Sequence, residues 1–312
     1  MGIALFINPR SRANRLNPKG IHALARAMGE TGQVFSPPSL DAVAEVAQTL
    51  AKDPPNVIAI HGGDGTVHSV LTRLIPAFGS TPLPPLALLT GGTMNVVPHS
   101  LGLAAPPVAF MEHLANCERT GVAPQTVTRR CLQVGQQYGF VFGNGIVAGF
   151  LDEYYSTGSY GPSRAVWIGL RALSSKLAGG DYGRHTLAPF EGDVEIDGQP
   201  YPGEAFTAVS AATVREVGLG FKLHNRADED PDRFNVVIVK GNPVALLTDL
   251  LSIRLGQGIS PDRADSRLAT WVRLYPAQAD VDMPYTIDGD MYRTAVPLDL
   301  RIGPPIKLAR PK

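Results

Sequence analysis

The chain has 312 residues, of which 44% are hydrophobic and 18% are charged, and its 28 basic and 28 acidic side chains leave no formal net charge. A chain of this length accommodates one large domain or two medium ones with a sizeable core. The balanced charge gives no broad basic surface, so we expect no nucleic-acid partner. Two cysteines are too few for a disulfide framework and favour a reducing compartment.

The sequence shows no targeting signal and no membrane span. Its first apolar stretch, Ile3 to Ile7, is too short for a signal peptide, and no uninterrupted apolar run of about 18 residues follows. We therefore expect a cytoplasmic protein. Any contact with a membrane is expected to be peripheral, at its inner face.

Strand-like and helix-like patterns alternate over the first part of the chain. Continuous apolar runs typical of buried strands occupy residues 3–7, 57–60 and 86–89, and helical spacing of apolar residues occurs at 21–28, 41–50 and 67–74. A short helix is expected at 95–101. This alternation predicts a layered α/β domain with a mostly parallel sheet over residues 1–122.

The pattern changes to short β-rich runs after residue 122. They occupy residues 131–134, 140–142, 194–196, 206–209, 236–239, 270–274, 285–287 and 296–302. Asp197-Gly198 and Asp288-Gly289 are turn signals, and helical patterns occur at 163–177 and 243–255. We predict a second, β-sandwich-like domain over residues 123–312. The sequence leaves open whether residues 304–312 pack on this domain or return to the first.

A glycine-rich turn follows the second buried strand and precedes a helix. Residues 62–66 read Gly-Gly-Asp-Gly-Thr. Glycines let backbone N–H groups approach an anion, and a helix N-terminus favours phosphate. The carboxylate of Asp64 would repel a bare phosphate, so it fits chiefly where Mg²⁺ lies between them. A tight turn in which Asp64 is only the helix N-cap explains the same residues.

Two more polar turns follow predicted strands. Residues 91–95 read Gly-Gly-Thr-Met-Asn, and residues 8–11 read Asn-Pro-Arg-Ser. Each alone is explained as a helix cap or an ordinary turn. Because the carboxyl ends of parallel strands meet at one edge of a sheet, the three turns together favour a ligand site there.

These motifs resemble those of the bacterial diacylglycerol kinase and sphingosine kinase-like lipid kinases. The Gly-Gly-Asp-Gly-Thr unit is also shared with NAD kinases and phosphofructokinases. The other motifs resemble those of the lipid kinases and distinguish them from these two families. The resemblance extends, in the family's order, over residues 8–11, Ser36 with 41–42, 62–66, 89–95, 100–103, 218–220 with Ala227 and Asp232, and 285–290.

The resemblance implies a lipid kinase that uses ATP and Mg²⁺ to phosphorylate a diacylglycerol-like or sphingoid-like hydroxyl. It implies an N-terminal α/β nucleotide-binding domain of the NAD kinase and diacylglycerol kinase type, with ATP between the two domains and a lipid cleft in the β-rich domain. The residues that match nucleotide-lining positions are Asn8, Ser36, Gly62, Gly63, Asp64, Gly65, Thr66, Val67, His68, Gly92, Thr93 and Asn95.

The resemblance also assigns the catalytic and metal positions. Asp64 would lie near Mg²⁺ and the phosphates, and Asp290 occupies the position of the general base that takes the proton of the lipid hydroxyl. From the residues alone, 288–290 is better explained as a hairpin turn, which is also the explanation for Asp197-Gly198. Some relatives hold a structural Mg²⁺ through two backbone carbonyls and one Asp, at positions that match Glu229, Asp232 and Phe234.

The sequence departs from the family pattern at several of these positions. Asp290 replaces a Glu, His68 and Ser69 stand where Asn and Glu are common, and Arg233 replaces a Gly. These departures leave open a catalytically silent nucleotide- or lipid-binding protein. The shared glycine-rich loop leaves open a kinase of a soluble substrate, of the NAD kinase type.

Overall fold

The computed structural model describes residues 2–92, 94–156, 167–169, 171–172, 174–175, 178–243, 245–278 and 281–312. The chain forms two compact units, one of the residues up to Cys131 with Pro304–Lys312, the other of Leu132–Gly303. The boundary predicted at residue 122 lies before this division of the chain. Strand β5 (Thr126–Val134) begins in the first unit and ends in the second, so the β-rich pattern starts before the second unit does.

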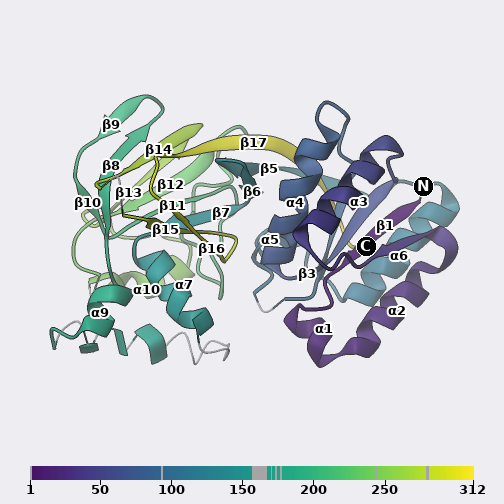
Figure 1. Ribbon diagram of the computed structural model, residues 1–312, viewed down its shortest axis with the longest axis horizontal. Coiled ribbons are helices and arrows are strands. Elements are labelled where there is room, and N and C mark those ends of the chain that lie inside the picture. Colours follow the sequence, from purple (N-terminus) through teal and green to yellow (C-terminus); the bar gives the residue numbers. More distant parts are fainter. Residues whose placement is uncertain are drawn as a thin grey trace. The chain divides into compact units, whose positions relative to one another are not determined.

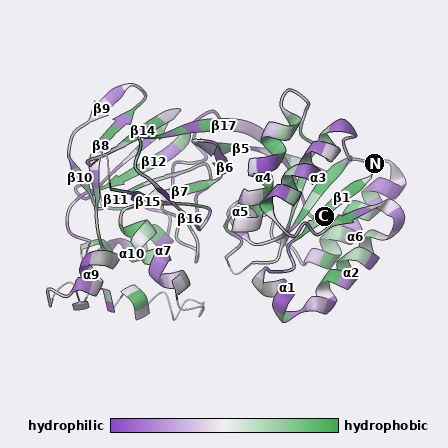
Figure 2. Cartoon of the chain, viewed as in Figure 1, coloured by the Kyte–Doolittle hydropathy of each residue, from purple (hydrophilic) through white to green (hydrophobic). Residues whose placement is uncertain are grey.

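The first unit is built on a parallel sheet, as the alternating pattern predicts. Its strands are β1 (Ile3–Ile7), β2 (Gly32–Phe35), β3 (Val57–Gly62) and β4 (Leu86–Thr90), in the order β4-β3-β1-β2. Every residue of β1 and β3 is buried, which explains their continuous apolar runs. Figure 2 shows these strands as hydrophobic.

Helices cover both faces of this sheet (Figure 1). They are α1 (Arg12–Leu16), α2 (Pro18–Met28), α3 (Leu40–Lys52), α4 (Asp64–Phe78), α5 (Val96–Ser100) and α6 (Pro107–Thr120), and a 3₁₀ turn, η1, spans Gly29–Thr31. Leu24 of α2 and Phe110 of α6 pack against Leu5 on one face. Helices α3 and α4 lie on the other face.

The last strand, β17 (Leu298–Ala309), is longer than the run predicted at 296–302. Its first residues pair antiparallel with β14 (Trp271–Pro276) in the second unit. Its later residues belong to the first unit, where Leu308 pairs with Leu86 in parallel. Residues 304–309 thus extend the first unit's sheet, which settles the position that the sequence left open.

The second unit contains two antiparallel sheets. One has β8 (Phe190–Ile196), β9 (Gln199–Tyr201), β10 (Ala205–Phe206), β14 and the start of β17. The other has the order β13 (Ala264–Ala269), β12 (Phe234–Val239), β11 (Ala208–Ala212), β7 (Val141–Asn144), β15 (Met283–Ile287) and β16 (Asp290–Thr294). The end of β5 pairs with β6 (Gln137–Gly139).

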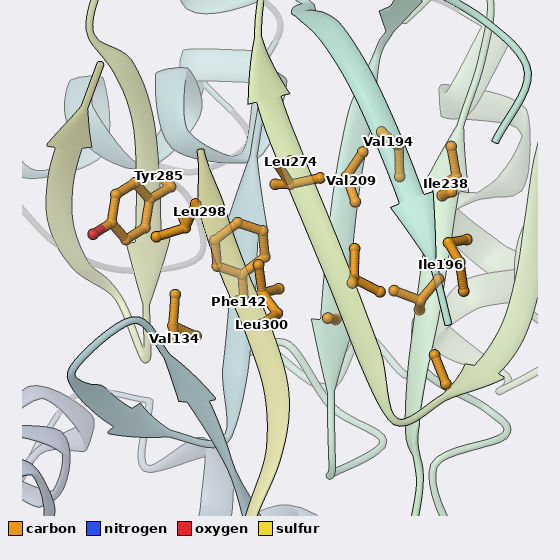
Figure 3. Close-up of a cluster of buried hydrophobic side chains, with 14 of the residues drawn as sticks. Val134, Phe142, Val194, Ile196, Val209, Ile238, Leu274, Tyr285, Leu298 and Leu300 are labelled. Carbon is orange, nitrogen blue, oxygen red and sulfur yellow. The ribbon is translucent and has the colours of Figure 1, made fainter. Parts of the chain in front are cut away.

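Apolar side chains from both sheets form the core of the second unit (Figure 3). Phe142, Val209 and Ile238 come from one sheet, and Val194 and Leu274 come from the other. This arrangement is the layered β structure that the short alternating runs predict.

Helical segments flank the sheets of the second unit. They are α7 (Ile146–Ser156), α9 (Asp181–Thr186), the 3₁₀ segment η2 (Ala245–Asp249) and α10 (Leu250–Arg254). The single helix expected at 243–255 is therefore divided in two. Residues 167–169, 171–172 and 174–175 are helical within the predicted 163–177, and the rest of that range lies outside the described residues. Among the described residues, none of the helices has the length and apolar character needed to cross a membrane.

Candidate active site

Candidate ligand residues follow the carboxyl ends of strands β1, β2, β3 and β4 of the first unit. Asn8 follows β1, Ser36 follows β2, Gly63 follows β3 and Gly91 follows β4. In the sheet, β2 lies on one side of β1 and β3 lies on the other. After β2 the chain crosses over to β3, so the topological switch point lies between β1 and β3. Open α/β sheets bind ligands in the crevice outside this point.

Asn8 connects the end of β1 to the helix that follows β3. Its Nδ2 donates a hydrogen bond of 2.9 Å to Thr66 Oγ1, and its backbone N–H donates to the carbonyl of His61 at 3.2 Å. Its Oδ1 accepts from the N–H of Arg10 at 2.9 Å. The side chain of Asn8 thus fixes two of the predicted loops to each other.

Asn14 is a residue of this edge that the sequence reasoning missed. It is 3% exposed; its Nδ2 donates to the carbonyl of Asn8 at 2.8 Å, and its Oδ1 lies 2.8 Å from Nε2 of buried His61. Burial lowers the pKa of His61, which keeps its ring neutral at pH 7. An asparagine inside a short helix carries no motif by which the sequence could have revealed this role.

The two glycine-rich loops approach each other through their backbones. The N–H of Gly91 donates to the carbonyl of Gly62 at 2.8 Å. A Cβ atom on Gly92 would overlap the Cα of Gly63, and one on Gly62 would overlap the side chain of Thr66. Only glycine permits this spacing, so these residues are required by the close approach of the loops.

Asp64 is the first residue of α4, and the N-cap of that helix is Gly63. The alternative in which Asp64 is only this N-cap is therefore wrong. Its Oδ1 instead accepts a hydrogen bond of 2.7 Å from the N–H of Val96, the first residue of α5. Burial raises the pKa of Asp64 to about 6 against the opposing effect of backbone hydrogen bonds. A desolvated carboxylate beside a phosphate-type loop suits a divalent cation, so the residues present fit Mg²⁺.

The second glycine-rich loop is closed by Asn95. Its backbone is left-handed, with φ of 47°, a conformation that asparagine tolerates. Its Oδ1 accepts from the N–H of Gly92 at 2.9 Å, and its Nδ2 donates to the carbonyl of Gly92 at 3.2 Å. The amide of Asn95 therefore shapes the loop. Thr93, predicted to contact the nucleotide, lies outside the described residues.

Two of the predicted nucleotide-lining side chains face the interior. His68 is 0% exposed and Val67 is 5% exposed, both on α4. The N–H of Val67 donates to the carbonyl of Gly63 at 3.1 Å, so the structure gives these two residues a place in the interior of the first unit. The polar neighbours of the loop, Gly65 and Thr66, are partly exposed.

In the second unit, two Asp-Gly turns have the same construction. Asp288 and Gly289 have φ of 50° and 90°, and Asp197 and Gly198 have φ of 48° and 81°, as in type I′ hairpin turns. The carboxylate of Asp288 accepts hydrogen bonds from the N–H groups of Phe140 and Val141, at 2.9–3.1 Å.

The carboxylate of Asp197 has a matching role. Its Oδ1 accepts from the N–H groups of Thr270 and Trp271, at 3.0 and 2.9 Å. In both turns, therefore, the first aspartate binds the backbone of a neighbouring segment. The likeness between the turns ends two residues later, where one has Asp290 and the other has Gln199.

Asp290 differs from these turn aspartates in its surroundings. It begins β16, opposite Ile287, and is partly buried. Within the described part of the chain, its carboxylate makes no hydrogen bond or ion pair. Desolvation raises its pKa. A partly buried carboxylate with unused acceptor atoms and a raised pKa has the properties of a proton acceptor.

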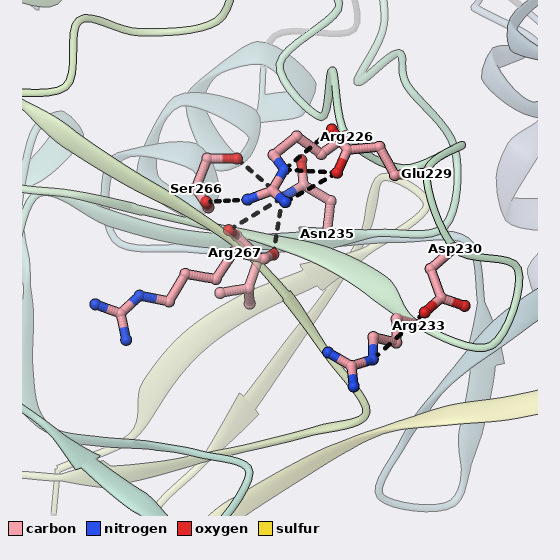
Figure 4. Close-up of polar contacts among 8 residues, drawn as sticks. Arg226, Glu229, Asp230, Arg233, Asn235, Ser266 and Arg267 are labelled. Carbon is pink, nitrogen blue, oxygen red and sulfur yellow. Dashed lines mark hydrogen bonds and ion pairs between the residues drawn. The ribbon is translucent and has the colours of Figure 1, made fainter.

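The second predicted metal position lies among ion pairs (Figure 4). Arg226 donates to the carboxylate of Glu229 at 2.8–3.1 Å, and Arg233 Nε lies 3.5 Å from Asp230. The Glu229 side chain is thus paired with Arg226, and the predicted ligands are the side chain of Asp232 with the backbone carbonyls of Glu229 and Phe234. Among the described residues, no three His, Cys, Asp or Glu side chains cluster as a metal site.

Comparison with known proteins gives one family and one fold. Residues 2–125 match the model of the diacylglycerol kinase catalytic domain. No curated protein matches the chain. A structure of a diacylglycerol kinase from Bacillus anthracis str. Sterne has a TM-score of 0.63 and 16% identity, with 99% of this chain and 96% of that chain covered.

Two structures of a provisionally assigned diacylglycerol kinase from the same strain have TM-scores of 0.68 and 0.66. Both are 16% identical to this chain; 99% of this chain is covered in each, with 96% and 97% of the other chains. These similarities show the fold of both units. The motifs at the carboxyl ends of the parallel strands lie within residues 2–125, the region that matches the diacylglycerol kinase catalytic domain.

Proposed function

We propose that this member of a lipid kinase family transfers the γ-phosphate of ATP to the hydroxyl of a diacylglycerol-like or sphingoid-like lipid, with Mg²⁺. The observation that carries the proposal is the edge of the first unit's sheet, where two close-packed glycine loops and Asp64 lie outside the switch point. This arrangement suits a nucleotide phosphate and a divalent ion.

The glycine loops and α4 supply the phosphate site. Helix α4 has 15 residues; in its first turn the N–H groups of Thr66 and Val67 donate to the carbonyl of the N-cap Gly63, at 2.9 and 3.1 Å, so an anion would meet the N–H groups that precede them. Partial positive charge at this end favours the phosphates of ATP. Asn8 and Thr66 hold the loops together through their 2.9 Å hydrogen bond.

Asp64 is the residue proposed to hold Mg²⁺, directly or through the phosphates. When bound, the ion supplies neutralisation of charge on the transferred phosphoryl group. Burial disfavours the ionised form of Asp64, and a nearby cation favours it. We therefore expect the carboxylate to be ionised in the loaded enzyme at neutral pH.

Asp290 is proposed as the general base. Its carboxylate accepts the proton of the lipid hydroxyl as the hydroxyl oxygen attacks the γ-phosphorus. The bond between that phosphorus and the oxygen of the ADP leaving group breaks, which gives the phosphorylated lipid and ADP. The raised pKa of Asp290 makes it a better proton acceptor than an exposed aspartate.

The experiment is transfer of labelled γ-phosphate from ATP and Mg²⁺ to a panel of lipids in mixed micelles. Wild type is run beside Asp64→Asn and Asp290→Asn, with Asp193→Asn, an exposed aspartate of β8, as the matched control. We expect label in one lipid, lost in the two site variants and kept in the control. Label in a soluble acceptor alone, or ATP binding without any product, would overturn the proposal.

A further inference from the structure

Three leucines in and after α10 lie exposed. Leu250, Leu251 and Leu255 are 42%, 69% and 64% exposed, whereas Ile253 of the same helix is 7% exposed and packs inward. α10 lies outside the sheets of the second unit, on the side of α7 and α9 (Figure 1). Exposed apolar side chains grouped on one short segment mark a surface for a partner or a membrane.

Basic side chains lie beside these leucines. The N–H of Lys222 donates to the carbonyl of Ile253 at 3.1 Å, which places residue 222 against α10. Arg254 Nη1 donates to the carbonyl of Leu219 at 2.9 Å, and its guanidinium lies 5.9 Å from the ring of Phe221. Helix α10 and the segment 219–222 therefore form one surface, the leucine surface: Leu250, Leu251, Leu255, Lys222 and Arg254.

The charge of the leucine surface is positive. In the part of the chain that the structure describes, neither Lys222 nor Arg254 forms an ion pair. Asp249, directly before α10, is 4% exposed, and its carboxylate is bound by Arg263 at 2.8 Å. The nearby Arg215 lies 3.9 Å from Asp228, so this pair adds little net charge.

We propose that the leucine surface docks the protein onto the surface of a bilayer containing anionic phospholipids. Leucines that enter the boundary between headgroups and acyl chains gain burial, and cations beside them are attracted to anionic headgroups. A neutral protein partner would match the leucines and leave both cations without counter-charge. The inference deepens the proposed function, because a kinase of membrane lipids must reach an acceptor that stays in the bilayer.

The test is co-sedimentation of the full chain with vesicles of phosphatidylcholine, with or without phosphatidylglycerol. We expect stronger binding to anionic vesicles and weaker binding as salt rises. The double variant Leu251→Ser/Leu255→Ser should lower binding to anionic vesicles by about tenfold. Lys222→Gln should lower it about threefold to fivefold, with no effect on neutral vesicles. Leu40→Ser, at a 50% exposed leucine of α3, is the control that should bind as wild type.

Several results would overturn the docking surface: no vesicle binding by wild type, unchanged binding by the double variant, or an equal loss in the Leu40 control. Loss of a dimer in the double variant, seen by sedimentation, would assign the surface to a second copy instead. Transfer to lipid in detergent micelles should stay as in wild type for the double variant. Vesicle binding by a chain with no kinase activity would overturn the proposed function and leave the docking surface standing.

Discussion

The carboxylate of Asp64 accepts a hydrogen bond of 2.7 Å from the backbone N–H of Val96, a residue 32 positions later in the chain. The bond joins the first residue of α4 to the first residue of α5. It therefore couples the two glycine-rich loops through the carboxylate that is proposed to hold Mg²⁺. Burial makes the ionised form of this carboxylate costly in the free protein, and a cation bound beside it would offset that cost.

Replacement of Asp64 by Asn is expected to stabilise the free protein and abolish its activity. The pKa is raised to about 6 in the folded protein, so the folded protein holds this proton more tightly than the unfolded chain does. The resulting contribution to the free energy of unfolding is fully present below the unfolded pKa of 3.8 and is lost as pH rises through 6. At pH 7.5, Asp64→Asn should raise the free energy of unfolding by about 1–3 kcal/mol. Urea titrations at pH 7.5 measure this; a lower free energy of unfolding in the variant would contradict the electrostatic account.

Replacement of Asp290 by Asn should impair turnover and leave nucleotide binding intact. Loss of a general base typically costs about 10²–10⁴-fold in rate. Wild-type turnover should rise with pH through the raised pKa of Asp290, because the base is active when ionised. Asp290→Glu restores the carboxylate and should keep the pH dependence. A variant without a carboxylate at 290 that turns over normally, with the wild-type pH profile, would exclude Asp290 as the base.

Much of the first unit could be predicted from sequence because its strands are buried on both faces. The continuous apolar runs at β1, β3 and β4, each followed by a polar turn, place the candidate residues at one sheet edge. The bond between Asp64 and Val96 could not be predicted, because it depends on how two loops fold against each other. The same holds for Asn14, whose partners lie at Asn8 and His61.

The second unit was predicted less completely because tertiary contacts decide its details. The pattern at 243–255 suits one helix, but Asp249 turns inward to bind Arg263, and the chain passes from a 3₁₀ segment into α10 there. The length of β17 depends on pairing with β4, which lies far away in sequence. Asp197 and Asp288 have the same local signals, and what separates the two turns is the carboxylate of Asp290, which has no hydrogen-bond or ion-pair partner in the part of the chain that the structure describes.

Replacement of Gly92 by Ala should destabilise the first unit. A Cβ atom there would overlap the Cα of Gly63, and the backbone of one loop must move to admit it. Such overpacking typically costs about 1–3 kcal/mol. Gly20→Ala, within α2, is the control: its Cβ would lie 3.4 Å from the Asn17 side chain, and alanine favours a helix. Thermal unfolding of both variants tests the contrast, and equal melting temperatures would show that the loops have room to separate.

His224 should make the protein less stable as pH falls. The side chain is 0% exposed, its Nε2 lies 2.9 Å from Ser210 Oγ, and burial lowers its pKa to about 3. Because the unfolded chain binds this proton near pH 6.5 and the folded protein does not, stability falls as pH drops below 6.5 towards 3. The contribution is about 1.4 kcal/mol per pH unit.

Comparison of wild type with His224→Gln isolates this contribution. Urea titrations at pH 7.5 and 5.0 give the loss of unfolding free energy for each protein, and the loss should be smaller in the variant by about 2 kcal/mol. The variant is expected to be less stable than wild type at pH 7.5, because glutamine fills the buried site imperfectly. The difference between the two pH values is therefore the decisive quantity. An equal loss in both proteins would show that His224 gains a proton in the folded state as readily as in the unfolded one.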